Sequence, residues 1–153
     1  MTQTKGIRFD NPRTPMMDGG GVIIIDKAYV ATNPTASDTV DFKLPKGIQL
    51  SLLRIHFPVA LDDSTGLTAK VGWYPVTGTT ATQNGVAATS DDDDAFKTAA
   101  SMGRAIGMFD CDIALPMVFE EDVYIRITWT VTATSFVAGW VYCTIGGAYL
   151  GVK

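Results

Sequence analysis

Four consecutive aspartates, residues 91–94, are the part of this sequence that comes nearest to a chemical site. Carboxylates are the ligands that hard cations such as Ca²⁺ prefer, but a calcium loop places them at alternate positions around a turn-forming glycine. Consecutive side chains cannot all point at one ion, so the run does not match that pattern. We interpret it instead as the start of a short helix over residues 92–102, because carboxylates stabilise the positive end of a helix dipole.

The single histidine, His56, has no catalytic partner beside it in the sequence. General acid–base catalysis requires a group that orients and tunes the base, and no nucleophile-elbow motif is present. We therefore interpret His56 as a half-buried residue of a strand. The glycines at positions 19–21 precede neither Lys-Ser nor Lys-Thr, so they do not form a phosphate-binding loop. From these patterns we expect no enzymatic activity and no cofactor.

The two cysteines, Cys111 and Cys143, lie far apart and both fall in strand-like segments. We favour two buried free thiols, which behave as small apolar side chains in a reducing compartment. A disulfide stays open as the alternative if their strands are neighbours. One histidine and two cysteines also leave little material for a zinc site.

Six aromatic residues fit either a sugar-stacking platform or apolar packing. Most of them alternate with small or β-branched residues, which is typical of strands that pack against an opposite sheet or a subunit interface. The six are Trp73, Tyr74, Trp129, Trp140, Tyr142 and Tyr149. We favour packing and keep the ligand platform as an alternative.

The charge balance argues against nucleic acid and anionic membranes as main partners. Twelve basic and sixteen acidic residues give a net charge of −4 and a pI of about 4.7, whereas phosphate binding requires clustered Lys and Arg. Residues 127–152 carry no charge, but threonines alternate with Ile127, Trp129 and Val131. This period of two indicates a strand and not a membrane-spanning helix. The first 17 residues lack the apolar core of an export signal.

The chain of 153 residues, 46% apolar and 18% charged, has the size and composition of one globular domain. Alternating or β-branched segments predict strands at residues 22–31, 39–44, 48–57, 67–74, 105–112, 115–119, 123–131, 137–145 and 148–152. Residues 76–90 fit either a hairpin or a long loop. We predict an extended N-terminal arm over residues 1–20 and a single domain over residues 21–153. The domain is expected to be all-β, an antiparallel two-sheet sandwich that is jelly-roll-like, with one short helix.

Three segments of the chain resemble small virion proteins of tailed bacteriophages. Residues 41–47 carry a Leu-Pro-Lys-Gly turn that introduces a strand, a leucine-rich strand follows through residues 53–55, and residues 67–72 end in a Val-Gly step. A loop, a short helical piece and two closing strands complete the similar layout. The resemblance covers residues 37–145 and concerns the order of these segments, not a specific sequence motif.

The resemblance implies a non-enzymatic head decoration or cement subunit that binds and stabilises the assembled capsid. It implies the major capsid protein as a partner, self-association as a homotrimer, and a place on the capsid surface of the virion after assembly in the host cytoplasm. The arm would then be the tether, because a segment that cannot bury itself gains order on another protein surface. The contact residues expected in it are Arg8, Phe9, Pro12, Met16 and Met17.

Two other functions are open from the residues alone. A carbohydrate- or receptor-binding domain, as in a phage tail fibre or a lectin, would use the aromatic residues and the threonine-rich segment 76–90. A hydrolase built on a jelly roll would need paired carboxylates or a metal motif, and no such pattern is recognisable here. We therefore place the structural role first and the binding domain second.

Overall fold

The computed structural model describes residues 2–5, 21–83, 86–113 and 117–150. Within these ranges the chain forms twelve strands and no helix, so no helix that could cross a membrane is found there. The strands are β1 (Gln3–Lys5), β2 (Gly21–Val30), β3 (Thr39–Leu44), β4 (Ile48–Phe57), β5 (Thr68–Pro75), β6 (Thr80–Gln83), β7 (Val86–Ser90), β8 (Asp92–Ser101), β9 (Gly107–Asp110), β10 (Met117–Val118), β11 (Val123–Val131) and β12 (Gly139–Tyr149).

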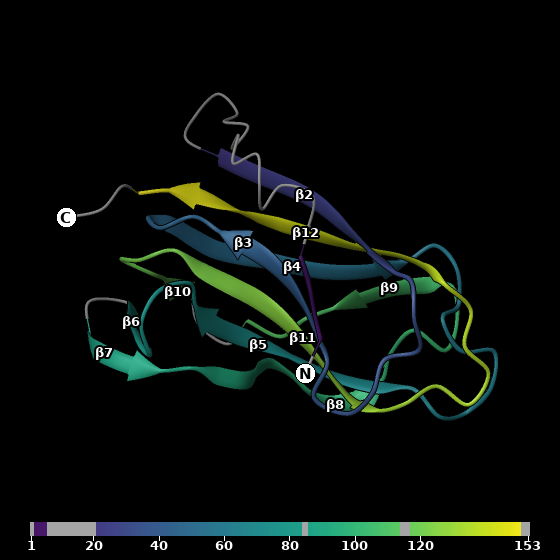
Figure 1. The fold of residues 1–153 in the computed structure, drawn as a ribbon. Helices are drawn as coiled ribbons and strands as arrows, with labels where there is room; N and C mark the ends of the chain where they lie inside the picture. Colours follow the sequence, from purple (N-terminus) through teal and green to yellow (C-terminus); the bar gives the residue numbers. More distant parts are fainter. Residues whose placement is uncertain (1, 6–20, 84–85, 114–116, 151–153) are drawn as a thin grey trace.

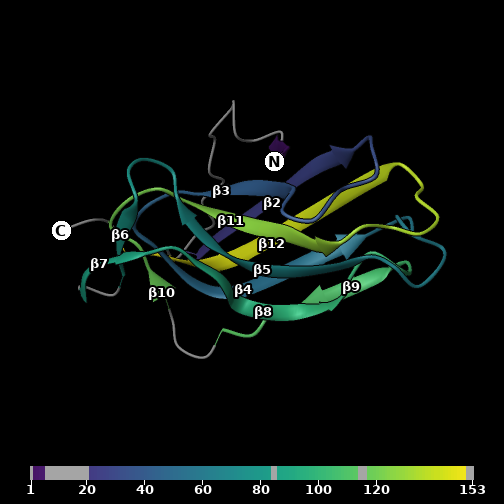
Figure 2. The ribbon, with the colours of Figure 1, turned by 60° about the horizontal axis from the view of Figure 1, so that its bottom comes forward.

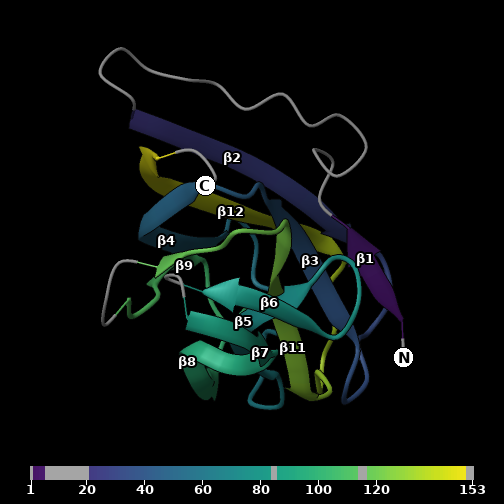
Figure 3. The same ribbon diagram turned by 90° about the vertical axis from the view of Figure 1, so that its left-hand side faces the viewer.

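Two sheets pack face to face (Figure 1). One has the strand order β1-β3-β11-β5-β8, and the other has the order β10-β4-β12-β2, with β9 also pairing with β4. Figure 2 shows β3, β11, β5 and β8 side by side in this order, and Figure 3 shows the two layers from their ends. Numbering the eight principal strands along the chain, without β1, β6, β7 and β10, gives 1-8-3-6 opposite 2-7-4-5, which is the strand order of a jelly roll. The expected all-β, two-sheet sandwich is thereby confirmed.

The core lies between the two sheets and follows from the period-two alternation of their strands. In β11, Val123, Ile125, Ile127 and Trp129 are all buried, and the residues between them face away from the opposite sheet. In β3 the same alternation buries the side chain of Phe42 in the core between the two sheets. Because successive side chains of a strand point to opposite faces, each sheet contributes one apolar face to a shared interior.

The helix expected over residues 92–102 is wrong, because this segment forms β8. The strand pairs with β5, with Trp73 opposite Asp92 and Ala69 opposite Ala100, and the register shifts between these ends. A helix of two or three turns is marginal on its own, whereas pairing with β5 satisfies the backbone and buries Phe96. Gly72 of β5 permits this pairing, since a Cβ there would lie 2.0 Å from the carbonyl oxygen of Asp92.

The acidic run lies at the start of a strand and not, as expected, at the start of a helix. Asp92, Asp93 and Asp94 are exposed on β8, which is the last strand of its sheet. Charged side chains on such an edge discourage pairing with another chain. The carboxylates therefore protect a sheet edge and do not cap a helix.

The structure decides between two alternatives for one further segment and corrects the predicted bounds of another. The segment 76–90 contains the hairpin alternative, since β6 and β7 pair in antiparallel fashion. The two C-terminal strands expected at 137–145 and 148–152 are one strand, β12, with an irregularity between Gly146 and Gly147. A Cβ at Gly147 would lie 1.9 Å from the carbonyl oxygen of Gln49, so glycine lets the strand continue through this point.

Asp62 organises the loops at one end of the sandwich. Its fully buried carboxylate accepts hydrogen bonds from the backbone N–H groups of Ser64, Gly66 and Leu67 at 2.8–3.1 Å, and from those of Thr134 and Ser135 at 3.2 and 3.0 Å. Burial alone would raise the pKa of Asp62, but these donors outweigh it and lower the pKa to about 2. One charged side chain therefore joins the loop after β4 to the loop after β11.

We expect Asp62→Asn to destabilise the protein by about 2 kcal/mol, because an amide loses the charge and turns an N–H group towards backbone donors. Since the folded protein lowers the pKa of Asp62, its contribution is complete above the ordinary value of 3.8 and is lost as the pH falls towards about 2. Urea unfolding at several pH values measures both effects. Asp63→Asn, at the exposed neighbouring position, is the control, and equal losses for the two variants would contradict this assignment.

Candidate functional site

The residues that could carry chemistry in the sequence are not brought together. His56 lies half-buried on β4 and stacks against Tyr142 of β12, with 5.9 Å between ring centroids. The described residues contain no group of three His, Cys, Asp or Glu side chains that could hold a metal ion. Asp93 contacts Lys70 at 2.5 Å on the surface. The arrangement around His56 is one of ring packing.

Cys111 and Cys143 are both buried free thiols in the structure. Burial raises the pKa of Cys111 to about 12 and raises the pKa of Cys143 well above its ordinary value. The thiolate is the reactive form of cysteine, so neither side chain is poised for nucleophilic chemistry near neutral pH.

The six aromatic residues divide between the interior and the surface. Trp73 and Trp129 are buried in the core, where Trp73 packs on Phe119 with 4.9 Å between ring centroids. Trp140 and Tyr142 are half-buried on β12, on the side facing away from the other sheet. Trp73 and Trp129 therefore pack in the core, as the packing interpretation predicts. Trp140 and Tyr142 instead lie on a surface of the sandwich.

That surface is the outward side of the sheet formed by β2, β12, β4 and β9, which we call the apolar outer face. Its side chains occupy alternate positions of the four strands. They are Ile23, Ile25, Lys27 and Tyr29 of β2, Trp140, Tyr142 and Thr144 of β12, Leu52, Arg54 and His56 of β4, and Met108 and Asp110 of β9. Figure 1 shows the sheet that carries it as the layer of β2, β12 and β4.

The strand registers arrange these side chains in cross-strand rows. Tyr142 lies opposite Lys27 on one side and His56 on the other, and His56 lies opposite Met108. In the adjoining row, Thr144 stands between Ile25 and Arg54. Directly opposed residues on one face of a sheet are in contact distance, so the apolar outer face is a continuous surface across four strands.

Sequence reasoning missed most of this face. The run from Val22 to Ile25 predicts a strand, and its β-branched residues at four successive positions place apolar side chains on both sides of that strand. The exposed side of β2 carries Ile23, Ile25 and Tyr29. A strand that is apolar on both faces is the signal that could have revealed it.

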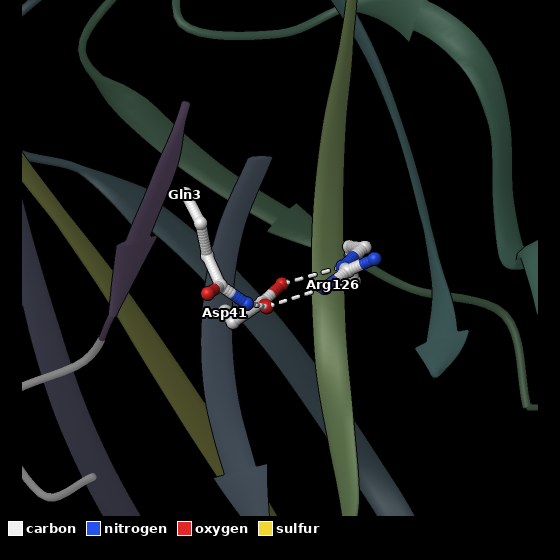
Figure 4. Close-up of polar contacts among 3 residues, drawn as sticks. All are labelled: Gln3, Asp41 and Arg126. Atoms are coloured by element: carbon white, nitrogen blue, oxygen red, sulfur yellow. Dashed lines mark hydrogen bonds and ion pairs between the residues drawn. The ribbon is translucent and has the colours of Figure 1, made fainter. Parts of the chain in front are cut away.

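The N-terminal strand β1 is held on the opposite sheet by polar contacts (Figure 4). The side-chain amide of Gln3 donates to the carboxylate of Asp41, whose two oxygens also accept hydrogen bonds from Nε and Nη2 of Arg126, both at 2.7 Å. Asp41 is fully buried and the Arg126 side chain is 11% exposed. The guanidinium lies 4.2 Å from the ring centroid of Tyr74. These contacts connect β1, β3, β11 and β5.

A second contact fixes the start of the chain. The backbone N–H of Thr2 donates to the carboxylate of Asp38 at 2.7 Å, and the backbone N–H of Thr39 donates to the carbonyl of Thr2 at 2.9 Å. Backbone donors from Thr35 and Thr2 lower the pKa of Asp38. Residues 2–5 thus belong to the sandwich. The contact residues expected in the arm, Arg8, Phe9, Pro12, Met16 and Met17, lie outside the described residues.

We expect Asp41→Asn to destabilise the protein by about 3 kcal/mol, because it leaves the nearly buried guanidinium of Arg126 without its counter-charge. Chemical denaturation gives the free energy of unfolding. Asp93→Asn removes one partner of an exposed ion pair with Lys70 and should cost less than about 1 kcal/mol. A loss for Asp41→Asn no larger than that of the control would show that the buried pair is not important for stability.

The fold has a counterpart among solved structures. No protein-family model and no curated protein matches the chain. A chain from the capsid of Ralstonia phage GP4 is similar, with a TM-score of 0.70 and 17% sequence identity, and the match covers 99% of this chain and 100% of that chain. At this identity the similarity establishes the fold alone. The sandwich described here, over its whole length, has the fold of a chain found in a phage capsid.

Proposed function

We propose that this protein is a structural component of a bacteriophage virion, a head decoration or cement subunit that binds the assembled capsid and stabilises it. The observation that carries the proposal is the end-to-end similarity of fold to a chain from the capsid of Ralstonia phage GP4. Since the match covers nearly all of both chains, the similarity extends over the whole β-domain and is not limited to a few of its strands.

The organisation of the molecule suits a binding role that is not enzymatic. The buried pair of Asp41 and Arg126 and the loop contacts of Asp62 stiffen the sandwich at separate places. The apolar outer face exposes side chains such as Ile25 and Met108, which are 58% and 62% exposed. Exposed apolar surface of this kind is typical of protein interaction sites.

The proposed partners are the major capsid protein and other copies of this chain, as a homotrimer. The proposed location is the outer surface of the capsid, reached during assembly in the host cytoplasm. The N-terminal residues Arg8, Phe9, Pro12, Met16 and Met17 are proposed to contact the capsid or a neighbouring subunit. Their connection to the sandwich supports this, since residues 2–5 are fixed on β3.

The test is binding to capsids assembled from the major capsid protein encoded in the same genome. We expect the purified protein to sediment with these capsids saturably and to raise the temperature at which they disassemble. Light scattering of the free protein should give three times the chain mass of 16.4 kDa. A protein that stays in the supernatant at saturating capsid concentration would contradict the proposal, and a stable monomer would contradict the trimer.

A further inference from the structure

We infer that the apolar outer face is the footprint through which the protein lies on the capsid shell, and that its partner is an apolar, neutral to acidic surface of the shell protein. This inference rests on the proposed function and adds to it the face and the chemistry of the contact. The opposite sheet, with its acidic edge strand β8, would then point away from the shell.

The face is more apolar than a solvent-facing sheet surface requires. Five of its side chains are large, apolar and well exposed: Ile23 at 41%, Ile25 at 58%, Tyr29 at 46%, Leu52 at 41% and Met108 at 62%. They are contributed by β2, β4 and β9, with Trp140 and Tyr142 of β12 between them. Contiguous apolar surface of this extent marks interaction sites in soluble proteins.

The side chains of the face are already held in place. Tyr29 and Trp140 pack with 5.1 Å between ring centroids, and the Nζ of Lys27 lies 4.4 Å from the ring of Trp140. His56 and Tyr142 form a second ring pair. A prearranged surface loses little side-chain entropy on binding, so more of its contact energy appears as affinity.

The charges on the face indicate the partner's chemistry. Arg54 and Asp110 pair with each other at 2.5 Å, which leaves Lys27 as the unbalanced charge of the face. The face is thus formally +1, although the whole chain is −4. Acidic groups gather elsewhere, on the exposed strand β8. A neutral or acidic apolar surface is therefore accepted at this face, whereas the β8 edge repels an acidic one.

The size of the face favours a capsid over a second copy of the chain as the occupant. Four strands, each about 4.8 Å wide, and about six residues of strand length, at about 3.3 Å each, give a planar area of about 400 Å². A stable interface between two free proteins requires about 800 Å² on each partner. When the shell also binds another part of the protein, such as the N-terminal segment, this second contact raises the effective concentration of the face at its own binding site. A small contact area is then sufficient.

The geometry also disfavours a sugar as the occupant. A sugar would stack on the exposed ring of a tryptophan, but Lys27 and Tyr29 already lie against Trp140. The most exposed members of the face, Ile25 and Met108, are aliphatic. Aliphatic side chains suit contact with another protein surface, where buried apolar area supplies the energy.

The experiment compares single substitutions in capsid co-sedimentation with the full chain. We expect Ile25→Asp and Met108→Asp each to weaken binding by about tenfold or more, because each places an unpaired carboxylate in an apolar contact with a neutral or acidic surface. Thr98→Asp, at an exposed position of β8 on the other sheet, is the matched control and should bind as the unaltered protein does. Circular dichroism and melting temperatures establish that the variants fold. Binding should persist in about 1 M NaCl, since an apolar contact is little screened by salt.

Each outcome separates this inference from the proposed function. If the unaltered protein sediments with capsids and both face variants bind equally well, the face is not the footprint, while the decoration role stands. Binding that is lost at high salt, or a change of mass in light scattering without a change in capsid binding, would also overturn the inference. A glycan that binds the unaltered protein but not the face variants would do the same. If the unaltered protein does not bind capsids, the proposed function itself fails.

Discussion

Burial of one face of each sheet against the other is the constraint on which this structure depends. It fixes the alternation of β11 and β3, and it requires the polar backbone of the connecting loops to be satisfied at the ends of the sandwich. Asp62 meets that requirement at one end by accepting five backbone hydrogen bonds. The buried pair of Asp41 and Arg126 fixes the outer side of the opposite sheet and holds β1 against it. The apolar outer face is the side of its sheet that does not take part in the shared core.

Much of the fold could be predicted because period-two alternation is a local signal. The strands expected at 39–44, 48–57 and 123–131 have these bounds in the structure. The helix expected over 92–102 failed because residues such as Ala95 and Ala99 favour helices locally, whereas a partner strand distant in sequence decides the outcome. Likewise, the strands expected at 137–145 and 148–152 are one strand, because the glycines between them allow β12 to continue beside β4.

The candidate site was harder to predict because sequence patterns show which residues are apolar but not which side of a sheet is covered. Trp129 and Trp140 look alike in the sequence, yet one lies in the core and the other on the outer face. The buried pair of Asp41 and Arg126 joins residues 85 positions apart, a contact that local patterns do not reveal. The role of Arg8 to Met17 as a tether stays a prediction.

The position of β12 has a consequence for biosynthesis. Among the described strands it comes last in the sequence, yet it lies in the middle of its sheet, hydrogen-bonded to β2 on one side and β4 on the other. Until β12 has been synthesised and has left the ribosome, β2 and β4 lack this partner, and their edges are open to pairing with other nascent chains. The sheet therefore closes late in synthesis, and a chain that terminates before β12 cannot close it at all.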